Sequence, residues 1–196
     1  MSMETKRKAL AEIADRLTEH KQLARSAASL AKNFKPTTAD SLRRTKDLAY
    51  WLFVNDKLEE SLDVCSLLND IKFSNDYNIW TWVELTLALE WKLRTIAEQP
   101  EAAQQCSDKI LSTYITGSQD ERTTISKVLE RRLNGSLLYD SRIAEAEQDK
   151  DLTSERNFRL LQIGQLLFIQ ALGGSEVLPV PELEKQIALQ LAKLRA

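Results

Sequence analysis

Apolar side chains recur at steps of three and four positions through almost the whole chain, and this spacing restricts the fold more than any other feature. It places the apolar residues of each segment along one face of an α-helix. Glycine and proline, the residues that most often interrupt helices, number 5 and 4 among 196 residues. The sequence therefore predicts an all-α protein of about nine helices, with a core large enough for a single domain over residues 1–196.

The pattern divides this domain into three regions. Residues 1–36 are predicted to hold one basic amphipathic helix, whose apolar stripe runs over 5–33. Residues 37–116 are predicted to form helical hairpins, and residues 117–196 a further set of C-terminal helices. Short connections make successive helices antiparallel, so we expect the chain to be a string of αα-hairpins.

Two segments need closer inspection. Residues 79–93 alternate apolar and other side chains as a strand would, but they exceed a usual strand of about 5–6 residues, so we predict a buried central helix. Further on, Ser118 and Glu121 have the spacing of a capping box, which starts a helix, and Gly135 is of the type that favours helix ends. We expect one helix to stop at Gly135 and a shorter one to span 136–148.

The segment from Asp47 to Leu68 carries a more specific pattern. Small and large apolar residues fall there at the spacing of two helices packed around a polar joint at Asn55 and Asp56. The residues that carry the pattern are Leu48, Ala49, Leu52, Asp56, Leu58, Ser61, Cys65 and Leu68. This stretch resembles a tetratricopeptide repeat, in which small residues let the two helices of a hairpin touch. The resemblance implies a groove, lined by the first helix of each hairpin, that holds a peptide or a protein.

Several positions depart from the pattern of that family. Ser61 stands where alanine is usual, Ala49 and Asp56 stand at glycine positions, and no proline closes the unit. Residues 85–111 offer a blurred second copy, and the repeat period of about 34 residues does not continue beyond them. The resemblance therefore implies a tetratricopeptide-like helical domain with degenerate units, not a tandem array.

The net charge of −2 is unevenly distributed along the chain. Residues 1–46 hold 11 Lys and Arg against 5 Asp and Glu, which gives +6. Residues 47–196 hold 16 against 24, which gives −8. Two interpretations stay open: solvated helix faces of different sign, or a basic face for an acidic partner and an acidic face for a basic one.

Residues typical of catalysis are scarce. The single histidine, His20, lies on the apolar stripe, where we expect a half-buried structural role, with general-base chemistry as the alternative. Cys65 and Cys106 fall among helix-periodic apolar residues, where a thiol acts as a small hydrophobe. Phosphate-binding glycine motifs and histidine-containing metal motifs do not occur in the sequence. We therefore predict no catalytic residue, no cofactor and no metal; an enzyme built on scattered carboxylates is the alternative.

Aromatic residues gather between Tyr50 and Trp91 and offer candidates for partner binding, because tryptophan and tyrosine are enriched in interface hot spots. Trp80 and Trp82 lie about 200° apart on a helix, so both cannot face inward, and one of them or Trp51 is expected to reach the surface. Carboxylates crowd the nearby hairpin, as a solvated face or as a negative surface for a basic partner. The predicted partner-binding residues are Tyr50, Trp51, Tyr77, Trp80, Trp82, Glu59, Glu60 and Asp63.

The basic N-terminal arm raises nucleic acid as another partner, since phosphate contacts need such charges. Its basic residues are Lys6, Arg7, Lys8, Arg25, Lys32, Lys35, Arg43, Arg44 and Lys46. Acidic residues interrupt the arm, and the pI of about 5.6 is far below that of typical nucleic-acid binders, which argues against this partner. No run of about 18 apolar residues occurs, so we expect no membrane span and a cytoplasmic protein.

The sequence thus favours a non-enzymatic, cytoplasmic module that binds a protein partner through a groove or face of its hairpins. A bacterial immunity or antitoxin protein that neutralises a cognate basic toxin is one specific case, suggested by the −8 charge of residues 47–196. The alternatives are an enzyme with a carboxylate-based site and a nucleic-acid binder that uses the N-terminal arm.

Overall fold

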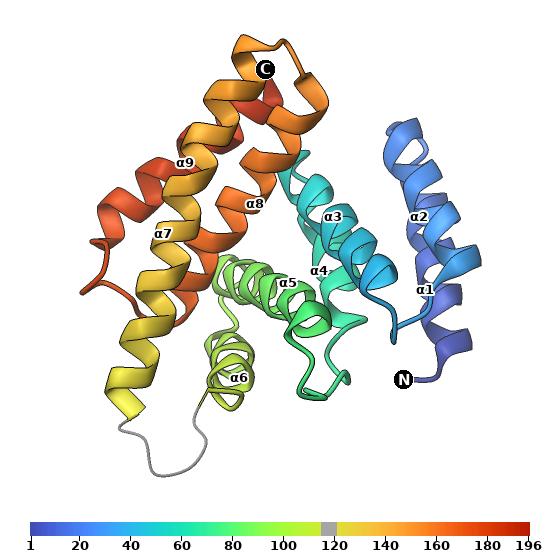
Figure 1. Ribbon diagram of the computed structural model, residues 1–196. Coiled ribbons are helices and arrows are strands. Elements are labelled where there is room, and N and C mark those ends of the chain that lie inside the picture. Colours follow the sequence, from blue (N-terminus) through green and yellow to red (C-terminus); the bar gives the residue numbers. More distant parts are fainter. Residues whose placement is uncertain (115–120) are drawn as a thin grey trace. The chain divides into compact units, whose positions relative to one another are not determined.

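The computed structural model describes residues 1–114 and 121–196, and for residues 121–123 it describes the backbone only. Nine α-helices and no strand occur in these ranges (Figure 1), which confirms the all-α prediction. The helices are α1 (Met3–Arg16), α2 (Lys21–Asn33), α3 (Ala39–Val54), α4 (Leu58–Ser66), α5 (Tyr77–Ile96), α6 (Pro100–Leu111), α7 (Glu121–Gln148), α8 (Leu152–Ala171) and α9 (Val180–Arg195). Ser118 of the expected capping box lies outside the described residues.

The chain divides into two compact units, Met1–Leu93 and Arg94–Ala196. The first unit contains α1 to α4 and nearly all of α5, and the second contains α6 to α9. One domain over residues 1–196 stays a prediction. Within the described ranges, none of the helices combines the length and the apolarity that a membrane span requires.

Successive helices of the first unit pack on one another: α1 on α2, α2 on α3, and α3 on α4. Asp56, at a φ of 57°, lies in the short joint between α3 and α4 and turns the chain back on itself. Thr38 caps α3, because its side chain accepts a hydrogen bond from the backbone N–H of Ser41. The predicted helical hairpins are therefore present in this unit. Its largest fully buried side chains are Trp80, Tyr50, Phe34, Leu10, Ile13, Leu17, Leu30, Leu42, Leu52, Leu68 and Leu85.

The expectation of one helix over residues 5–33 is wrong, because residues 17–20 separate α1 from α2. The break allows α1 to pack on α2, and Leu10 of the first helix is buried together with Ala27 and Leu30 of the second. A single straight helix would leave both halves of the apolar stripe facing the same way. Folding the stripe against itself buries it, and tertiary packing of this kind contributes more stability than unbroken helix.

The expected helix end at Gly135 is also wrong, because α7 runs through this residue as one helix of 28 residues. Glycine in a helix interior costs about 1 kcal/mol relative to alanine. The long packing of α7 against α8 outweighs that cost. The number of helices in the described ranges agrees with the prediction because one predicted helix is split and two others are joined.

Residues 79–93 form a helix, as predicted, within α5. Most of the side chains from Val83 to Leu93 are buried on all sides, which accounts for a pattern that alternates like a strand. Two hydrogen bonds connect this helix to polar side chains of the preceding segments. The Tyr50 hydroxyl donates to the carbonyl oxygen of Leu85 at 2.8 Å, and the Asn69 amide donates to the Glu90 carboxylate at 3.0 Å.

The second unit is held by α8, which packs on α7 and on α9. Arg159 of α8 has only 4% of its surface exposed, and its guanidinium connects the three helices. It donates hydrogen bonds to Glu155 on its own helix at 2.9 Å, to Glu147 of α7 at 2.6 Å and to Gln190 of α9 at 2.6 Å. A buried cation with three acceptors therefore fixes how these helices meet.

Candidate functional site

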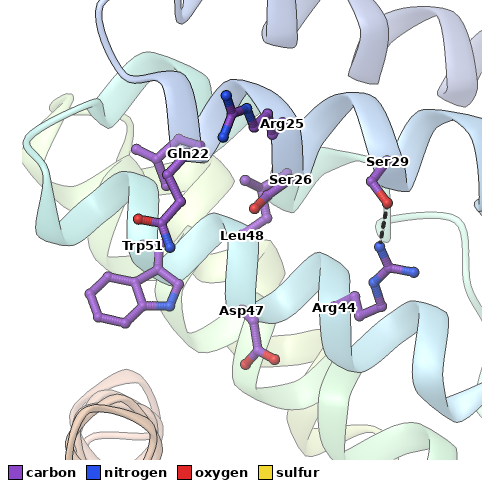
Figure 2. Close-up of a pocket in the computed structure, with 9 residues that line it drawn as sticks. Gln22, Arg25, Ser26, Ser29, Arg44, Asp47, Leu48 and Trp51 are labelled. Atoms are coloured by element: carbon purple, nitrogen blue, oxygen red, sulfur yellow. Dashed lines mark hydrogen bonds between the residues drawn. The ribbon is translucent and has the colours of Figure 1, made fainter. Parts of the chain in front are cut away.

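A groove of about 410 Å³ runs between α2 and α3 in the first unit (Figure 2). We call it the α2–α3 groove. Its lining residues are Gln22, Leu23, Arg25, Ser26 and Ser29 of α2, and Arg44, Asp47, Leu48 and Trp51 of α3. Figure 2 shows Gln22 and Trp51 at one end of the groove and Ser29 and Arg44 at the other.

The groove combines an apolar base with a polar rim. Leu48 is almost completely buried, Leu23 and Trp51 are half-buried, and these three supply the apolar contact surface. Arg25 and Ser26 on the rim are exposed to solvent. An apolar centre surrounded by polar groups is the usual anatomy of a protein-binding surface.

Arg44 is held in a defined orientation at its end of the groove. Its guanidinium donates a hydrogen bond of 2.9 Å to the hydroxyl of Ser29, across from α3 to α2 (Figure 2). A guanidinium carries five N–H donors in a fixed plane, so one bond to a hydroxyl leaves donors for a carboxylate or phosphate. Arg44 is therefore a preoriented hydrogen-bond donor in the lining of the groove.

Asp47, the one carboxylate among the lining residues, is paired with cations of its own helix. It accepts from Lys46 at 2.5 Å and lies 3.9 Å from Arg43. Lys46 is 3% exposed at its side chain, and its ammonium lies 5.6 Å from the ring centres of both Tyr50 and Trp82. Burial lowers the pKa of Lys46 against the opposing effect of Asp47.

The structure separates the predicted aromatic residues into two groups. Trp51 lines the groove, Tyr77 is 51% exposed, and Trp82 is half-buried. Tyr50 and Trp80 are in the core, with 0% and 2% of their surfaces exposed. The prediction that Trp80 and Trp82 do not both face inward is confirmed, but Tyr50 and Trp80 are wrong as partner-binding residues because no partner reaches a fully buried side chain.

The predicted acidic cluster is partly neutralised within the chain. Arg16 at the end of α1 forms ion pairs with Glu59 at 3.4 Å and with Asp63, both on α4. The hydrogen bond to Asp63 raises the pKa of Arg16 above its ordinary value, despite the opposing effect of burial. Glu60 is half-buried. The cluster therefore helps to hold α1 against the hairpin of α3 and α4.

The basic N-terminal arm is also engaged internally. Lys6 is buried and pairs with Asp70, which also accepts from the amino group of Met1 at 2.9 Å. Arg7 donates to the carbonyl oxygen of Phe34 at 3.1 Å. Together with the pairs of Arg16 and Lys46, these contacts show that part of the charge separation between residues 1–46 and the rest of the chain serves folding of the first unit.

The histidine and the two cysteines that were considered for chemistry lie at half-buried and buried positions. Cys65 and Cys106 are buried thiols, as predicted. His20 is half-buried and precedes the first turn of α2. In the part of the chain that the structure describes, no group of histidine, cysteine, aspartate and glutamate side chains has a metal-binding arrangement.

The sequence did not indicate that Gln22, Leu23, Ser26 and Ser29 would share a site with Trp51. Their place depends on α2 being a separate helix that packs on α3, and the continuous apolar stripe over 5–33 concealed that break. The available signals were Arg25 and Arg44 in the basic arm and Trp51 beside two buried neighbours.

Comparison with known proteins gives a match to a family model. No curated protein and no solved structure matches the chain. A family model described as a family of unknown function, DUF6707, matches residues 2–196. The match spans nearly the whole chain, and the protein therefore belongs to the DUF6707 family.

Proposed function

We propose that this protein is a non-enzymatic interaction module that binds a protein partner through the α2–α3 groove. The observation that carries the proposal is the combination of a half-buried tryptophan, an apolar base and a preoriented arginine in one groove. Tryptophan and arginine dominate interface hot spots, and an apolar base excludes water around them.

The resemblance of residues 47–68 to a tetratricopeptide repeat supports the same site. In that family the first helix of each hairpin lines the binding groove, and α3 is the first helix of this hairpin. It contributes Arg44, Asp47, Leu48 and Trp51 to the groove. The two helices also touch at the small positions of the pattern, since Ser61 donates to the carbonyl oxygen of Ala49 at 2.8 Å.

The lining of the groove supports binding more than catalysis. A carboxylate-based enzyme needs two acids of different pKa at one site. The groove lining includes one carboxylate, Asp47, and it is paired with Lys46. We place the module in the cytoplasm, because buried thiols at Cys65 and Cys106 fit a reducing compartment.

An immunity or antitoxin protein is one specific form of such a module. The −8 charge of residues 47–196 supports it, although Arg16 already pairs with Glu59 and Asp63. A product encoded beside this protein's gene would be the first candidate for the toxin. Binding of that product by the purified protein, with loss of its toxicity, is the expected result, and unchanged toxicity would reject this form.

Affinity capture with a matched pair of variants tests the general proposal. Immobilised wild-type protein, Trp51→Ala and Tyr77→Ala are exposed to lysate of the source cells, and captured proteins are quantified by mass spectrometry. Both variants remove a large aromatic side chain that reaches the surface, but only Trp51 lines the groove. Because a hot-spot truncation costs at least about 2 kcal/mol, Trp51→Ala should reduce capture of the partner about 30-fold or more.

Tyr77→Ala should retain the partner at the wild-type level. Circular dichroism and thermal melting confirm that both variants are folded. A partner captured equally by wild type and Trp51→Ala, or lost only with Tyr77→Ala, would place the interaction outside the groove.

A further inference from the structure

We infer that the occupant of the α2–α3 groove is an acidic peptide segment of the partner, with carboxylates on either side of a bulky apolar side chain. This inference rests on the proposed function and adds the chemistry of the partner. It differs from the basic partner that the acidic composition of residues 47–196 suggests, because the groove itself has the opposite charge.

The charges at the groove favour an anion. Arg25 and Arg44 line it from its two walls. Asp47 is compensated by Lys46 at 2.5 Å and by Arg43 at 3.9 Å, so the lining and its immediate pairs carry an excess of positive charge. Arg44 is already fixed by its bond to Ser29, which reduces the conformational entropy that a bound carboxylate would otherwise remove. Planar guanidinium groups bind carboxylates with two parallel hydrogen bonds.

The apolar part of the groove favours a side chain between those carboxylates. Leu23, Leu48 and Trp51 offer carbon surface in the same groove as the arginines (Figure 2 shows Leu48 and Trp51). A free anion such as phosphate leaves that surface exposed to water. A peptide covers it with an apolar residue and presents carboxylates to the rim, so both parts of the groove are used.

A nucleic-acid backbone fits the groove less well. A nucleic-acid backbone carries a charge at every nucleotide and needs a track of cations, of which the groove lining supplies Arg25 and Arg44. Three further basic residues of the first unit are engaged: Lys6 with Asp70, Arg16 with Glu59 and Asp63, and Lys46 with Asp47. A short acidic peptide needs only the two arginines of the groove.

Three short fluorescent peptides test the inference with the full-length protein. They share one bulky apolar residue and differ only in its flanks, which are glutamate, glutamine or lysine, and binding is followed by fluorescence anisotropy. The acidic peptide should bind at least about 10-fold more tightly than the other two, since a hydrogen bond to a charged group contributes about 1.5–3 kcal/mol. Its affinity should fall steeply when salt is raised, because exposed charges are screened.

Charge reversal supplies the decisive variant. Arg25→Glu combined with Arg44→Glu should abolish binding of the acidic peptide and create binding of the basic one. Lys21→Glu combined with Lys32→Glu makes the same change of charge on exposed residues of α2 outside the groove lining, and should leave the preference for the acidic peptide unchanged. Circular dichroism establishes that both double variants are folded.

Several outcomes overturn the inference. These are equal binding of all three peptides, tighter binding of the basic peptide by wild type, no binding of any peptide, or acidic-peptide binding that survives the groove reversal. Tighter binding of a single-stranded oligonucleotide through Arg25 and Arg44 would assign the groove to nucleic acid. The capture experiment with Trp51→Ala tests the proposed function separately. A captured partner that requires Trp51 but docks through basic residues would reject the acidic segment and leave the proposed function standing.

Discussion

The Ser61 hydroxyl of α4 donates a hydrogen bond of 2.8 Å to the carbonyl oxygen of Ala49 in α3, and both residues are completely buried. The two helices therefore approach closely at the positions where the tetratricopeptide pattern places small residues. A serine at the position usually held by alanine is compatible with this approach because its hydroxyl finds an acceptor on the facing helix. The contact joins the helix that lines the groove to the helix behind it.

Enlarging the small residue of this contact should destabilise the first unit. Ala49→Leu adds volume at a site with no exposed surface, and overpacking of this kind costs about 1–3 kcal/mol. Ser61→Ala should cost less, about 0.5–1.5 kcal/mol, because it removes one hydrogen bond. Urea unfolding followed by circular dichroism measures both. Ser66→Ala, which removes a hydroxyl bonded within α4 itself, is the control and should change stability least; equal losses in Ala49→Leu and Ser66→Ala would contradict the close approach.

Breaking the pair of Lys46 and Asp47 should have unequal effects. Asp47→Asn leaves the Lys46 ammonium buried without its carboxylate, and because Asp47 is one-third exposed we expect a loss of about 1–3 kcal/mol, below the usual cost for a fully buried pair. Lys46→Met removes the buried charge, which lies 5.6 Å from the ring centres of Tyr50 and Trp82, and keeps a long apolar side chain there, so it should be neutral or stabilising.

A double-mutant cycle measures this coupling by urea unfolding. In the Lys46→Met background, Asp47→Asn should cost much less than it does in the wild type. Equal costs in the two backgrounds would show that the carboxylate does not stabilise the buried ammonium.

The pairing of Asp70 predicts a loss of stability in acid. Burial raises the pKa of Asp70, but hydrogen bonds from Lys6 and the amino terminus outweigh it, and the pKa is lowered from 3.8. As the pH falls towards 3.8, the ordinary value, the carboxylate of the unfolded chain binds a proton before that of the folded chain does. The stabilisation is therefore complete above the unfolded pKa and is lost as the pH falls through the lower folded pKa.

Asp70→Asn should make the decline in stability between about pH 5 and pH 2 shallower and should reduce stability at neutral pH. Urea midpoints across that range measure both effects. Asp15→Asn, a change at an exposed residue of the same type, is the control. A decline as steep in Asp70→Asn as in the wild type would contradict the assignment.

The two glycines Gly135 and Gly174 should respond oppositely to alanine. Gly135 is inside α7, and an added Cβ would lie 3.9 Å from Cδ of Gln165, which is ordinary contact, so Gly135→Ala should stabilise by about 0.5–1 kcal/mol. At Gly174 the Cβ would lie 2.7 Å from the side chain of Ile169 and 3.0 Å from its carbonyl oxygen, so Gly174→Ala should destabilise by at least about 1 kcal/mol.

Thermal melting of the two alanine variants compares them directly. A lower melting temperature for Gly135→Ala would indicate that α7 is not continuous at this residue. A melting temperature for Gly174→Ala equal to that of the wild type would show that the close approach to Ile169 relaxes without cost.

The periodicity of apolar residues is sufficient to predict where helices occur, but it does not predict where one helix ends and the next begins. The apolar residues before and after residues 17–20 keep the same helical register, so the pattern reads identically for one long helix and for a hairpin of α1 and α2. Gly135 shows the reverse case, in which a residue that favours helix ends is carried by packing against α8. Packing against other helices determines whether the chain is helical at both positions, and a local sequence pattern carries no information on that packing.

The binding candidates were predictable in kind but not in position. Trp51 reaches the surface because it precedes the inward pair Leu52 and Phe53. Tyr50 of α3 is buried and donates a hydrogen bond to Leu85 of α5, and Trp80 is buried within α5 itself. A helix buried on most faces gives no clue in its sequence to its exposed side. Nor does composition reveal which charges pair within the chain, as Arg16 does with Glu59.

Site-specific photo-crosslinking tests the central claim most directly. A photoreactive amino acid replaces Ser26, an exposed residue of the groove rim, or Lys127, an exposed residue of α7, and the protein is irradiated in the source cells. We expect one discrete protein adduct from position 26, its loss in the Trp51→Ala background, and no such adduct from position 127. An adduct that forms from position 127 but not from position 26, or that persists from position 26 without Trp51, would contradict a docking site in the α2–α3 groove.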